Sequence, residues 1–376
     1  MNNYSFFGRA YMENGYFFTG FPGFICNQLI RQVLKQNNYQ GSVYVLVLPA
    51  MLQKAEQEKK LITSEMGMQE ERLQIIEGDI TKENLGVSDA KREEIAGRIS
   101  HVFHLAAIYD LAVPRDIAYK VNVIGTKNVN EWIRSLANLK RFTYFSTAYV
   151  AGNREGDLYE TELVLPQAFK NHYEETKYKA ELLVEEMKQE VPVTIIRPGI
   201  VKGHSKTGET IKFDGPYFIM NFLDRLRFLP LIPSIGRGEA VVNLVPVDYI
   251  IEATAYLSFL EKGAGKTYHL TDPSPYTVTE LYAMMMQELM KKQPKGSLPL
   301  SMAKLGLSLK PVRKFLGVEK EALDYFTWMG KFDCSHAQED LRGSGIKCPD
   351  FREGIGPMVS FYSENKTNPA YQIKII

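Results

Sequence analysis

The sequence has few cysteines, almost no net charge and no long hydrophobic run. Its three cysteines, at positions 26, 334 and 348, lack the spacing of a metal site and favour reduced thiols rather than a disulfide framework. Lys and Arg number 45 and Asp and Glu 44, so a net charge of +1 provides no overall field that would attract nucleic acid. No stretch approaches the roughly 18 consecutive apolar residues of a membrane span, and residues 1–15 lack the basic and apolar segments of a secretory signal. We therefore expect a cytoplasmic protein that binds neither nucleic acid nor a metal ion.

What the sequence does contain is a regular alternation of short apolar runs with longer helical patterns. The apolar runs are hydrophobic throughout, as in strands buried on both faces of a parallel sheet. Seven strands are predicted, at residues 16–19, 43–48, 73–77, 101–106, 141–146, 193–197 and 267–270. Helices are predicted between them, for example at residues 24–35 and 118–136. This order indicates βαβ units and a Rossmann-type, doubly wound α/β fold.

Glycine and proline interrupt this order at residues 198–203 and 230–238, and beyond residue 271 the pattern becomes mostly helical. We therefore expect an NAD(P)-binding domain over residues 14–272, with a substrate-lobe insertion at about 204–240. A smaller, mainly helical substrate lobe is expected over residues 273–376. Residues 1–13 form a polar extension ahead of the first predicted strand.

A glycine-containing turn follows the first predicted strand and opens a helix. Within residues 19–25, Gly20 permits a tight bend and Gly23 lets backbone amides approach a pyrophosphate. The N-terminus of the helix adds partial positive charge. Cys26 replaces the third glycine of the dinucleotide-binding fingerprint, and its small side chain is compatible with close helix–strand packing. The position of this glycine-containing turn, directly after the first strand, favours a dinucleotide-binding site over a simple turn.

Tyr173 and Lys177 are four residues apart and therefore share one face of a predicted helix. Asn171 can cap this helix, and Glu174 would complete a capping box. The lysine ammonium would lower the pKa of the tyrosine from roughly 10 and let it exchange a proton with a substrate oxygen near neutral pH. Thr147 follows the fifth predicted strand at the ligand-binding edge of the sheet, where its hydroxyl can donate to a carbonyl oxygen. Tyr-x-x-x-Lys alone arises by chance, but these signals in this order indicate a catalytic site.

Together these motifs resemble the extended short-chain dehydrogenase/reductase superfamily over residues 16–272. The resemblance rests on the glycine turn, Asp79, His104-Leu105-Ala106-Ala107, Asn122, Ser146-Thr147, the Tyr–Lys pair and Arg197-Pro198-Gly199. Residues 78–80, 84–88 and 242–249 are similar to the fatty acyl-CoA reductase and thioester reductase branch. That branch implies an NADPH-dependent oxidoreductase that reduces an acyl thioester to an aldehyde or an alcohol.

The resemblance also implies roles for individual residues. Thr147, Tyr173 and Lys177 would be catalytic. The residues expected to contact the cofactor are Thr19, Gly20, Phe21, Pro22, Gly23, Phe24, Ile25, Asp79, Ile80, Leu105, Ala106, Ala107, Asn122, Ser146, Pro198, Gly199 and Ile200. Leu48 stands where this branch usually has an arginine, so NADP(H) is favoured by the resemblance while NAD(H) stays open.

Two segments bear on the substrate. Residues 217–232 are rich in aromatic and aliphatic side chains, which either line a slot for an acyl chain or form the core of the lobe. Residues 291–331 mix lysines with leucines. This pattern is typical either of a solvated helix face or of a segment in peripheral contact with a membrane. We expect an apolar carbonyl substrate, and among such substrates an acyl thioester is favoured.

Three alternatives stay open at the level of the sequence. An alcohol dehydrogenase or ketoreductase acting on a hydroxylated apolar substrate would use the same three catalytic residues. A sugar-nucleotide epimerase or dehydratase would call for more hydrogen-bonding groups in residues 217–232. A non-enzymatic, dinucleotide-sensing protein on this fold would not need the Tyr–Lys pair. A monomer and a homodimer are both compatible with the sequence.

Overall fold

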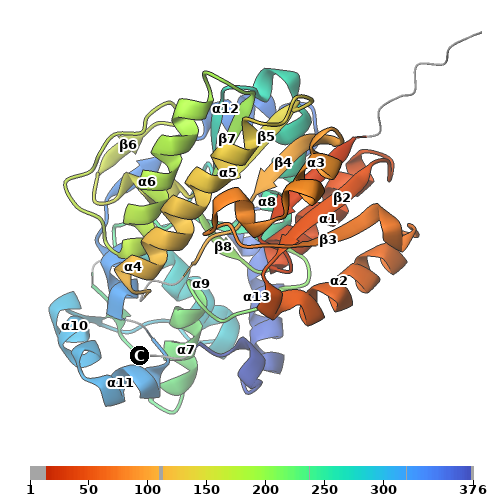
Figure 1. Cartoon of the computed structure of the whole chain (residues 1–376). Coiled ribbons are helices and arrows are strands. Elements are labelled where there is room, and N and C mark those ends of the chain that lie inside the picture. Colours follow the sequence, from red (N-terminus) through yellow and green to blue (C-terminus); the bar gives the residue numbers. More distant parts are fainter. Residues whose placement is uncertain (1–13, 110–112, 237, 319, 374–376) are drawn as a thin grey trace, which may run out of the picture.

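A parallel seven-stranded sheet runs through the computed structural model, which describes residues 14–109, 113–236, 238–318 and 320–373 (Figure 1). The strand order is β11-β7-β5-β4-β1-β2-β3, and neighbouring strands pair in parallel. The strands are β1 (Gly15–Thr19), β2 (Ser42–Val47), β3 (Leu73–Glu77), β4 (Ile99–His104), β5 (Arg141–Phe145), β7 (Val193–Pro198) and β11 (Thr267–Leu270). The seven strands predicted from the sequence are confirmed, each with its ends within two residues of the predicted ones.

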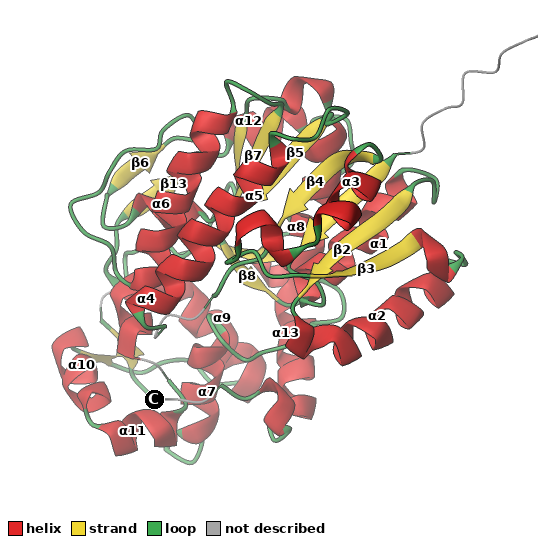
Figure 2. Cartoon of the chain, in the orientation of Figure 1, coloured by secondary structure: helices red, strands yellow, loops and turns green. Residues whose placement is uncertain are grey.

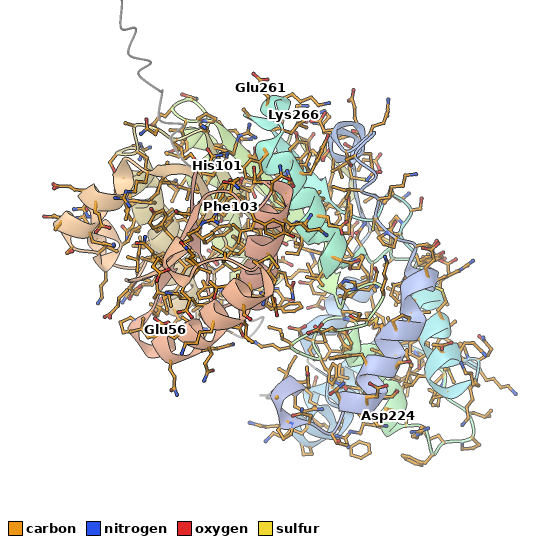
Figure 3. All side chains as sticks on the ribbon, turned by 90° about the vertical axis from the view of Figure 1, so that its right-hand side faces the viewer. Glu56, His101, Phe103, Asp224, Glu261 and Lys266 are labelled. Carbon is orange, nitrogen blue, oxygen red and sulfur yellow. The ribbon has the colours of Figure 1, made fainter. Side chains whose placement is uncertain are left out.

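Helices cover both faces of the sheet (Figure 2). One face packs against α1 (Phe24–Gln36), α2 (Leu52–Glu65) and α8 (Val247–Phe259), and the other against α3 (Asp89–Ala96), α5 (Gly125–Ile133) and α6 (His172–Met187). Adjacent residues of β1 show why the strands are apolar throughout: Phe17 packs in one of these cores and Phe18 in the other. Figure 3 shows Phe103 of β4 inside this domain, where its ring stacks on Phe18 at 4.5 Å, and Asp224 in a separate lobe.

The helix predicted at residues 118–136 begins earlier and is not uniform. It consists of α4 (Arg115–Ala118), a π-helical segment at Tyr119–Ile124, and α5. π-Helical turns within α-helices often occur at functional sites, and the π segment here contains Asn122, one of the predicted cofactor residues.

The strand order reverses at β1, which lies between β2 and β4. In an open α/β sheet, ligands bind in the crevice beyond the carboxyl ends of the strands at such a switch point. The turn that follows β1 and the loop that follows β4 therefore face one another across the place expected for a dinucleotide.

A smaller lobe lies beside the carboxyl edge of the sheet (Figure 1). It combines α7 (Tyr217–Arg225) with α9 (Val278–Met290), α10 (Leu300–Ser308), α11 (Lys310–Leu316) and α13 (Phe351–Asn365). Two short strands, β9 (Ser234–Ile235) and β12 (Ser297–Leu298), pair in parallel and so join the inserted segment that contains α7 to the C-terminal third of the chain. A shared core includes Tyr217, Met220, Met285 and Met358. At the base of the lobe, β8 (Ile200–Lys202) pairs with β10 (Leu244–Pro246).

Part of the C-terminal third packs on the sheet domain instead. β13 (Gly330–Phe332) pairs with β6 (Gly156–Leu158), and α12 (Ser335–Asp340) packs beside β11. The buried carboxylate of Glu160 accepts hydrogen bonds from the backbone N–H groups of His269 at 2.8 Å and His336 at 2.6 Å, which ties α12 to β11. The division of the chain at residue 272 therefore stays a proposal about how it is organised.

Neither a membrane span nor a metal centre is found in the part of the chain that the structure describes. Within that part, no helix combines the length and the apolar character needed to cross a bilayer. The same residues bring together no group of three His, Cys, Asp or Glu side chains that could hold a metal ion.

Candidate active site

The turn after β1 forms a close-fitting backbone cradle. Gly20 has a φ of +95°, and a Cβ atom there would lie 3.0 Å from the backbone nitrogen of Ala106. A Cβ atom on Gly23 would lie 2.7 Å from the carbonyl oxygen of Gly20, to which the Gly23 N–H donates at 2.8 Å. Helix α1 begins at the next residue and has no acidic side chain in its first turn. These features suit an anion held by backbone N–H groups.

Cys26, in place of the third glycine, is buried in the core beneath α1. Burial raises the pKa of its thiol, because the thiolate would lose its hydration. The residue therefore acts in packing, as the sequence suggested for this position.

His104 holds the ends of β1 and β4 together. Its Nδ1 atom lies 2.7 Å from the hydroxyl oxygen of Thr19, and its Nε2 atom lies 3.0 Å from that of Thr126. The Thr19 hydroxyl also accepts a hydrogen bond from the backbone N–H of Ala106 at 3.1 Å. Burial lowers the pKa of His104 to about 3, so the imidazole is neutral. Thr19, predicted to bind the cofactor, is fully buried and shapes the crevice from beneath.

Asn122 connects the loop after β4 to helix α6, which carries Tyr173 and Lys177. Its amide oxygen accepts from the backbone N–H of Ile108 at 2.9 Å, and its amide nitrogen donates to the hydroxyl of Thr176 at 3.0 Å. The side chain is buried. In this structure Asn122 is a positioning residue, and its contact with a cofactor stays a prediction.

The turn after β3 leaves Asp79 partly exposed and buries Ile80. Asp79 is half-buried, and its carboxylate accepts a hydrogen bond from the backbone N–H of Thr81 at 2.8 Å. Ile80 is buried and packs against Gly125, where a Cβ atom would lie 2.6 Å from the Ile80 side chain. Contacts of either residue with a cofactor stay predictions.

Helix α6 carries Tyr173 and Lys177, and its N-terminus differs in one detail from the prediction. The side chain of Asn171 accepts from the backbone N–H of Glu174 at 2.9 Å, as expected for an N-cap. The carboxylate of Glu174, however, accepts from the backbone N–H of Lys170 at 3.1 Å rather than from the cap residue. The predicted capping box is therefore wrong in its second half, because the Glu174 side chain points into a buried cluster with Tyr325 and Lys170.

The predicted effect of Lys177 on Tyr173 is also wrong in this structure. Burial raises the pKa of the Tyr173 phenol, and its hydrogen bond with Thr147 lowers that pKa by less. The Lys177 ammonium donates instead to the Tyr144 hydroxyl at 2.8 Å and to the Phe145 carbonyl at 2.6 Å. Burial lowers the pKa of Lys177 itself to about 7. Tyr173 is accordingly held in the protonated form, which can donate a proton but is a poor base.

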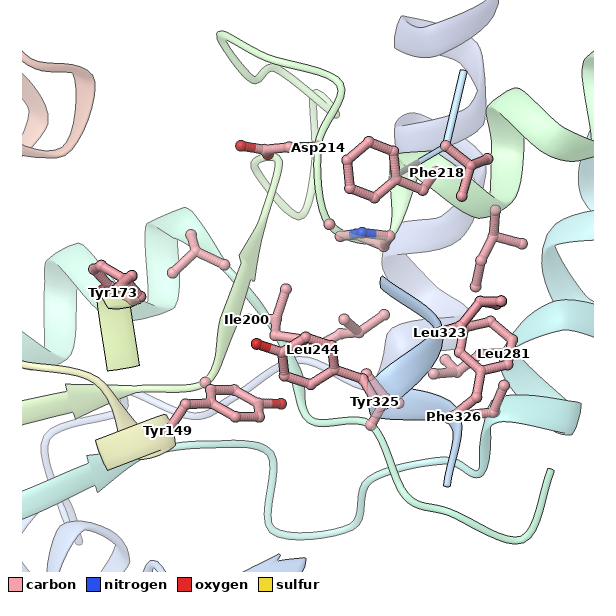
Figure 4. Close-up of a pocket in the computed structure, with 18 of the residues that line it drawn as sticks. Tyr149, Tyr173, Ile200, Asp214, Phe218, Leu244, Leu281, Leu323, Tyr325 and Phe326 are labelled. Carbon is pink, nitrogen blue, oxygen red and sulfur yellow. The ribbon is translucent and has the colours of Figure 1, made fainter. Parts of the chain in front are cut away.

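An apolar cavity of about 440 Å³ begins at these residues and continues into the lobe (Figure 4). Tyr149 and Tyr173 lie at one end of the view, and Leu323 and Phe326 at the other. Ten of the predicted site residues line the cavity, namely Ile25, Leu105, Ala107, Ser146, Thr147, Tyr173, Lys177, Pro198, Gly199 and Ile200. Ten others do not line it, namely Thr19, Gly20, Phe21, Pro22, Gly23, Phe24, Asp79, Ile80, Ala106 and Asn122. The cavity therefore joins Thr147, Tyr173 and Lys177 to the lobe and leaves Gly20 and Gly23 of the backbone cradle outside.

Much of the cavity wall comes from residues outside the predicted catalytic and cofactor-binding set. From α7, α9, α10, α11 and the segment after α11 these include Phe218, Phe222, Leu281, Ala303, Leu307, Val312, Leu316, Val318, Leu323 and Phe326. The apolar run at residues 217–232 thus contributes both to the cavity and to the core of the lobe, the two roles considered for it. Only the amphipathic spacing of these residues was visible in the sequence, because their common cavity depends on contacts between distant segments.

A buried cluster of side chains beside Tyr173 was also not predicted from the sequence. Glu174 is fully buried and accepts a hydrogen bond from the Tyr325 hydroxyl at 2.8 Å. The Lys170 ammonium lies 3.9 Å from the same carboxylate and 4.3 Å from the centre of the Trp328 ring. Burial raises the pKa of Glu174, and Lys170 lowers it by less. The cluster joins α6 to Tyr325, which lies 151 residues from Glu174 in the sequence, a link that no local pattern reveals.

Comparison with known proteins agrees with this site. Residues 18–254 match the model of a family of NAD-binding domains described as male sterility protein. A putative fatty acyl-CoA reductase of Drosophila melanogaster is 27% identical over 311 residues, which cover 69% of this chain and 59% of that protein. A non-canonical nonribosomal peptide synthetase of Aspergillus campestris is 25% identical over 279 residues, covering 69% of this chain and 26% of the synthetase. The chain thus spans only part of the length of these relatives.

Among solved structures, the terminal R domain from the myxalamid PKS-NRPS biosynthetic pathway is similar over nearly the whole chain. It superposes with a TM-score of 0.78 at 25% identity, covering 96% of this chain and 93% of that domain. The lobe is therefore shared as well as the nucleotide-binding sheet.

Proposed function

Because the chain belongs to the male sterility family of NAD-binding domains, within the extended short-chain dehydrogenase/reductase superfamily, we propose that it is an NAD(P)H-dependent reductase of acyl thioesters. The observation that carries the proposal is the course of the cavity. It starts at Thr147 and Tyr173 and continues between helices of the lobe, where the lining side chains are mostly apolar, whereas a sugar nucleotide would call for more hydrogen-bonding groups.

The backbone cradle fits the pyrophosphate of a dinucleotide. Side chains larger than hydrogen at Gly20 and Gly23 would meet neighbouring backbone atoms, and the start of α1 adds partial positive charge. The loop after β4 and the residues after β7 would then line the nicotinamide end, through Ala107 and Pro198 among others. A reduced nicotinamide bound there supplies a hydride to the substrate carbonyl carbon.

Thr147 and Tyr173 would bind the carbonyl oxygen of the thioester. Because burial raises the pKa of Tyr173, the phenol is protonated and available as a donor. As a C–H bond forms at the carbonyl carbon, negative charge collects on the oxygen, and the two hydroxyl groups stabilise it. The C=O bond then re-forms as the C–S bond breaks, the departing thiolate takes up a proton from water, and the products are an aldehyde and a free thiol. The Lys177 ammonium is held by the Tyr144 hydroxyl and the Phe145 carbonyl. Burial lowers its pKa to about 7, so its charge changes near neutral pH.

The direct test is to incubate the purified protein with palmitoyl-CoA and either NADPH or NADH, and to follow the loss of reduced cofactor and the release of free thiol. We expect acyl-CoA-dependent oxidation with one thiol released for each aldehyde formed. The faster cofactor would settle the preference that Leu48 leaves open, with NADPH expected to be the faster. Tight dinucleotide binding without any oxidation would contradict the thioester proposal and direct the search to ketones and alcohols.

Asp214 gives a second prediction for the same cavity. Its half-buried carboxyl group lines the wall beside Phe218, and burial raises its pKa to about 6 while Lys212 lowers it by less (Figure 4). An apolar ligand would remove more water from this group and so favour its neutral form. The affinity for a fluorescent fatty acyl analogue should therefore rise as the pH falls through about 6, by about tenfold between pH 8 and pH 5.

Matched variants isolate this effect. Asp214→Asn should lose the rise in affinity near pH 6 and keep only the contribution of Lys177, which lines the same cavity and changes its charge near pH 7. Glu209→Gln, at an exposed carboxylate nearby in the sequence, should keep the dependence of the unaltered protein. An unaltered pH profile in Asp214→Asn would show that the carboxyl group does not meet the ligand.

A further inference from the structure

Helices α10 and α11 carry apolar side chains on two faces. One face lines the cavity, with Leu307 and Leu316 among its residues. Side chains that do not line the cavity are nevertheless apolar and largely in solvent: Leu305 is 72% exposed, Leu309 60% and Phe315 54%. A surface helix of a globular protein ordinarily has one apolar stripe, facing the core. The second apolar face is thus unexplained by the packing of the lobe.

This part of the chain is also strongly basic. Residues 291–318 include seven basic side chains and no Asp or Glu, although the whole chain has a net charge of only +1; the seven are Lys291, Lys292, Lys295, Lys304, Lys310, Arg313 and Lys314. Lys310 and Lys314 are exposed and directly adjoin Leu309 and Phe315 in the sequence. Exposed apolar residues beside lysines are typical of a segment that lies in the interface of a membrane.

The position of the two helices connects this surface with the cavity. They lie at the outer end of the lobe, away from the sheet (Figure 1). Met302 lines the cavity and is also 58% exposed, so the cavity wall itself reaches solvent at α10. An apolar molecule that enters or leaves the cavity here would pass the exposed apolar face.

We propose that α10 and α11 form a docking surface for a lipid bilayer that contains acidic lipids, through which apolar ligands exchange with the cavity. The lysine ammonium groups meet the lipid phosphates and carboxylates, while Leu305, Leu309 and Phe315 enter the headgroup region. A second copy of the chain fits this face poorly, because a symmetric contact would bring Lys310 and Lys314 against the same lysines of the other copy, while the nearby carboxylates of Glu288 and Asp324 already pair with Lys291 and Lys304. The inference concerns binding and holds for any apolar substrate of the cavity.

Sedimentation with vesicles tests the proposal without any enzyme assay, so its outcome is separate from that of the thioester reaction. The full chain should bind vesicles of phosphatidylcholine mixed with phosphatidylserine, bind vesicles of phosphatidylcholine alone much more weakly, and dissociate as salt is added. Lys310→Glu with Lys314→Glu should lower binding to the mixed vesicles by about tenfold or more. Leu305→Gln with Phe315→Gln should lower it comparably.

Controls of matched chemistry lie on other surfaces. Lys35→Glu with Lys60→Glu, on α1 and α2, and Leu165→Gln, at a leucine that is 68% exposed, should bind vesicles as the unaltered protein does. All four proteins should melt at the same temperature as the unaltered chain, since every changed residue is exposed. Absence of vesicle binding, equal binding to neutral and mixed vesicles, or a dimer that is lost in Leu305→Gln with Phe315→Gln would overturn the proposal.

Discussion

Changing Tyr173 to phenylalanine should lower kcat by about 10²- to 10⁴-fold and leave the dissociation constant of the dinucleotide nearly unchanged. The phenol is the group that would donate a proton to the substrate oxygen, and burial keeps it protonated. The ring itself contacts Tyr109 edge-to-face with centroids 5.0 Å apart, a contact that phenylalanine preserves. Single-turnover kinetics with a long-chain acyl-CoA, together with a fluorescence titration of the reduced dinucleotide, would measure both quantities.

The same helix provides the control for this experiment. Tyr178 is buried on α6 but does not line the cavity, so Tyr178→Phe should retain most of the activity. Thr147→Val should lower kcat as well, because it removes the second donor to the oxygen and the hydrogen bond with Tyr173. Equal turnover by Tyr173→Phe and the unaltered protein would refute the assigned role of the phenol.

The largest effect on stability is expected at the buried ion pair between Arg197 and Glu181. The guanidinium lies 2.6 Å from the carboxylate, and both side chains are almost completely buried. Ser146 donates to the same carboxylate, and Arg197 donates to the Nε2 atom of His269 at 3.1 Å. Arg197→Met would leave the carboxylate buried without its partner and should lower the free energy of unfolding by about 3–5 kcal/mol.

Denaturant unfolding followed by circular dichroism would measure this loss as a lower midpoint. Adding Glu181→Leu to Arg197→Met should restore much of the stability, because the uncompensated charge is then removed as well. Arg134 forms a comparable pair with Glu190 on the surface, with side chains 43% and 44% exposed, so Arg134→Met should change the midpoint far less. An unchanged midpoint in Arg197→Met would mean that the pair does not stabilise the fold.

The sheet and the close-fitting turn after β1 could be predicted because the sequence determines them locally. Each strand is a continuous apolar run, and such runs are explained only by burial on both faces, as Phe17 and Phe18 illustrate. Gly20 and Gly23 were recognisable because no side chain fits where the backbone approaches itself so closely. The pairing of Tyr173 with Lys177 on one helix face likewise follows from the helical period alone.

The chemistry of the site was decided by the tertiary structure. A pKa depends on the water and the charges around a group, and these come from distant segments: burial reverses the expected shift of Tyr173, while Tyr144 and the end of β5 take the hydrogen bonds of Lys177. The contact of Glu174 with Tyr325 and the cavity between the helices of the lobe arise in the same way, from residues far apart in the sequence. Spacing determines which side chains share an element, but only the packing of elements determines which of them lose their water and meet.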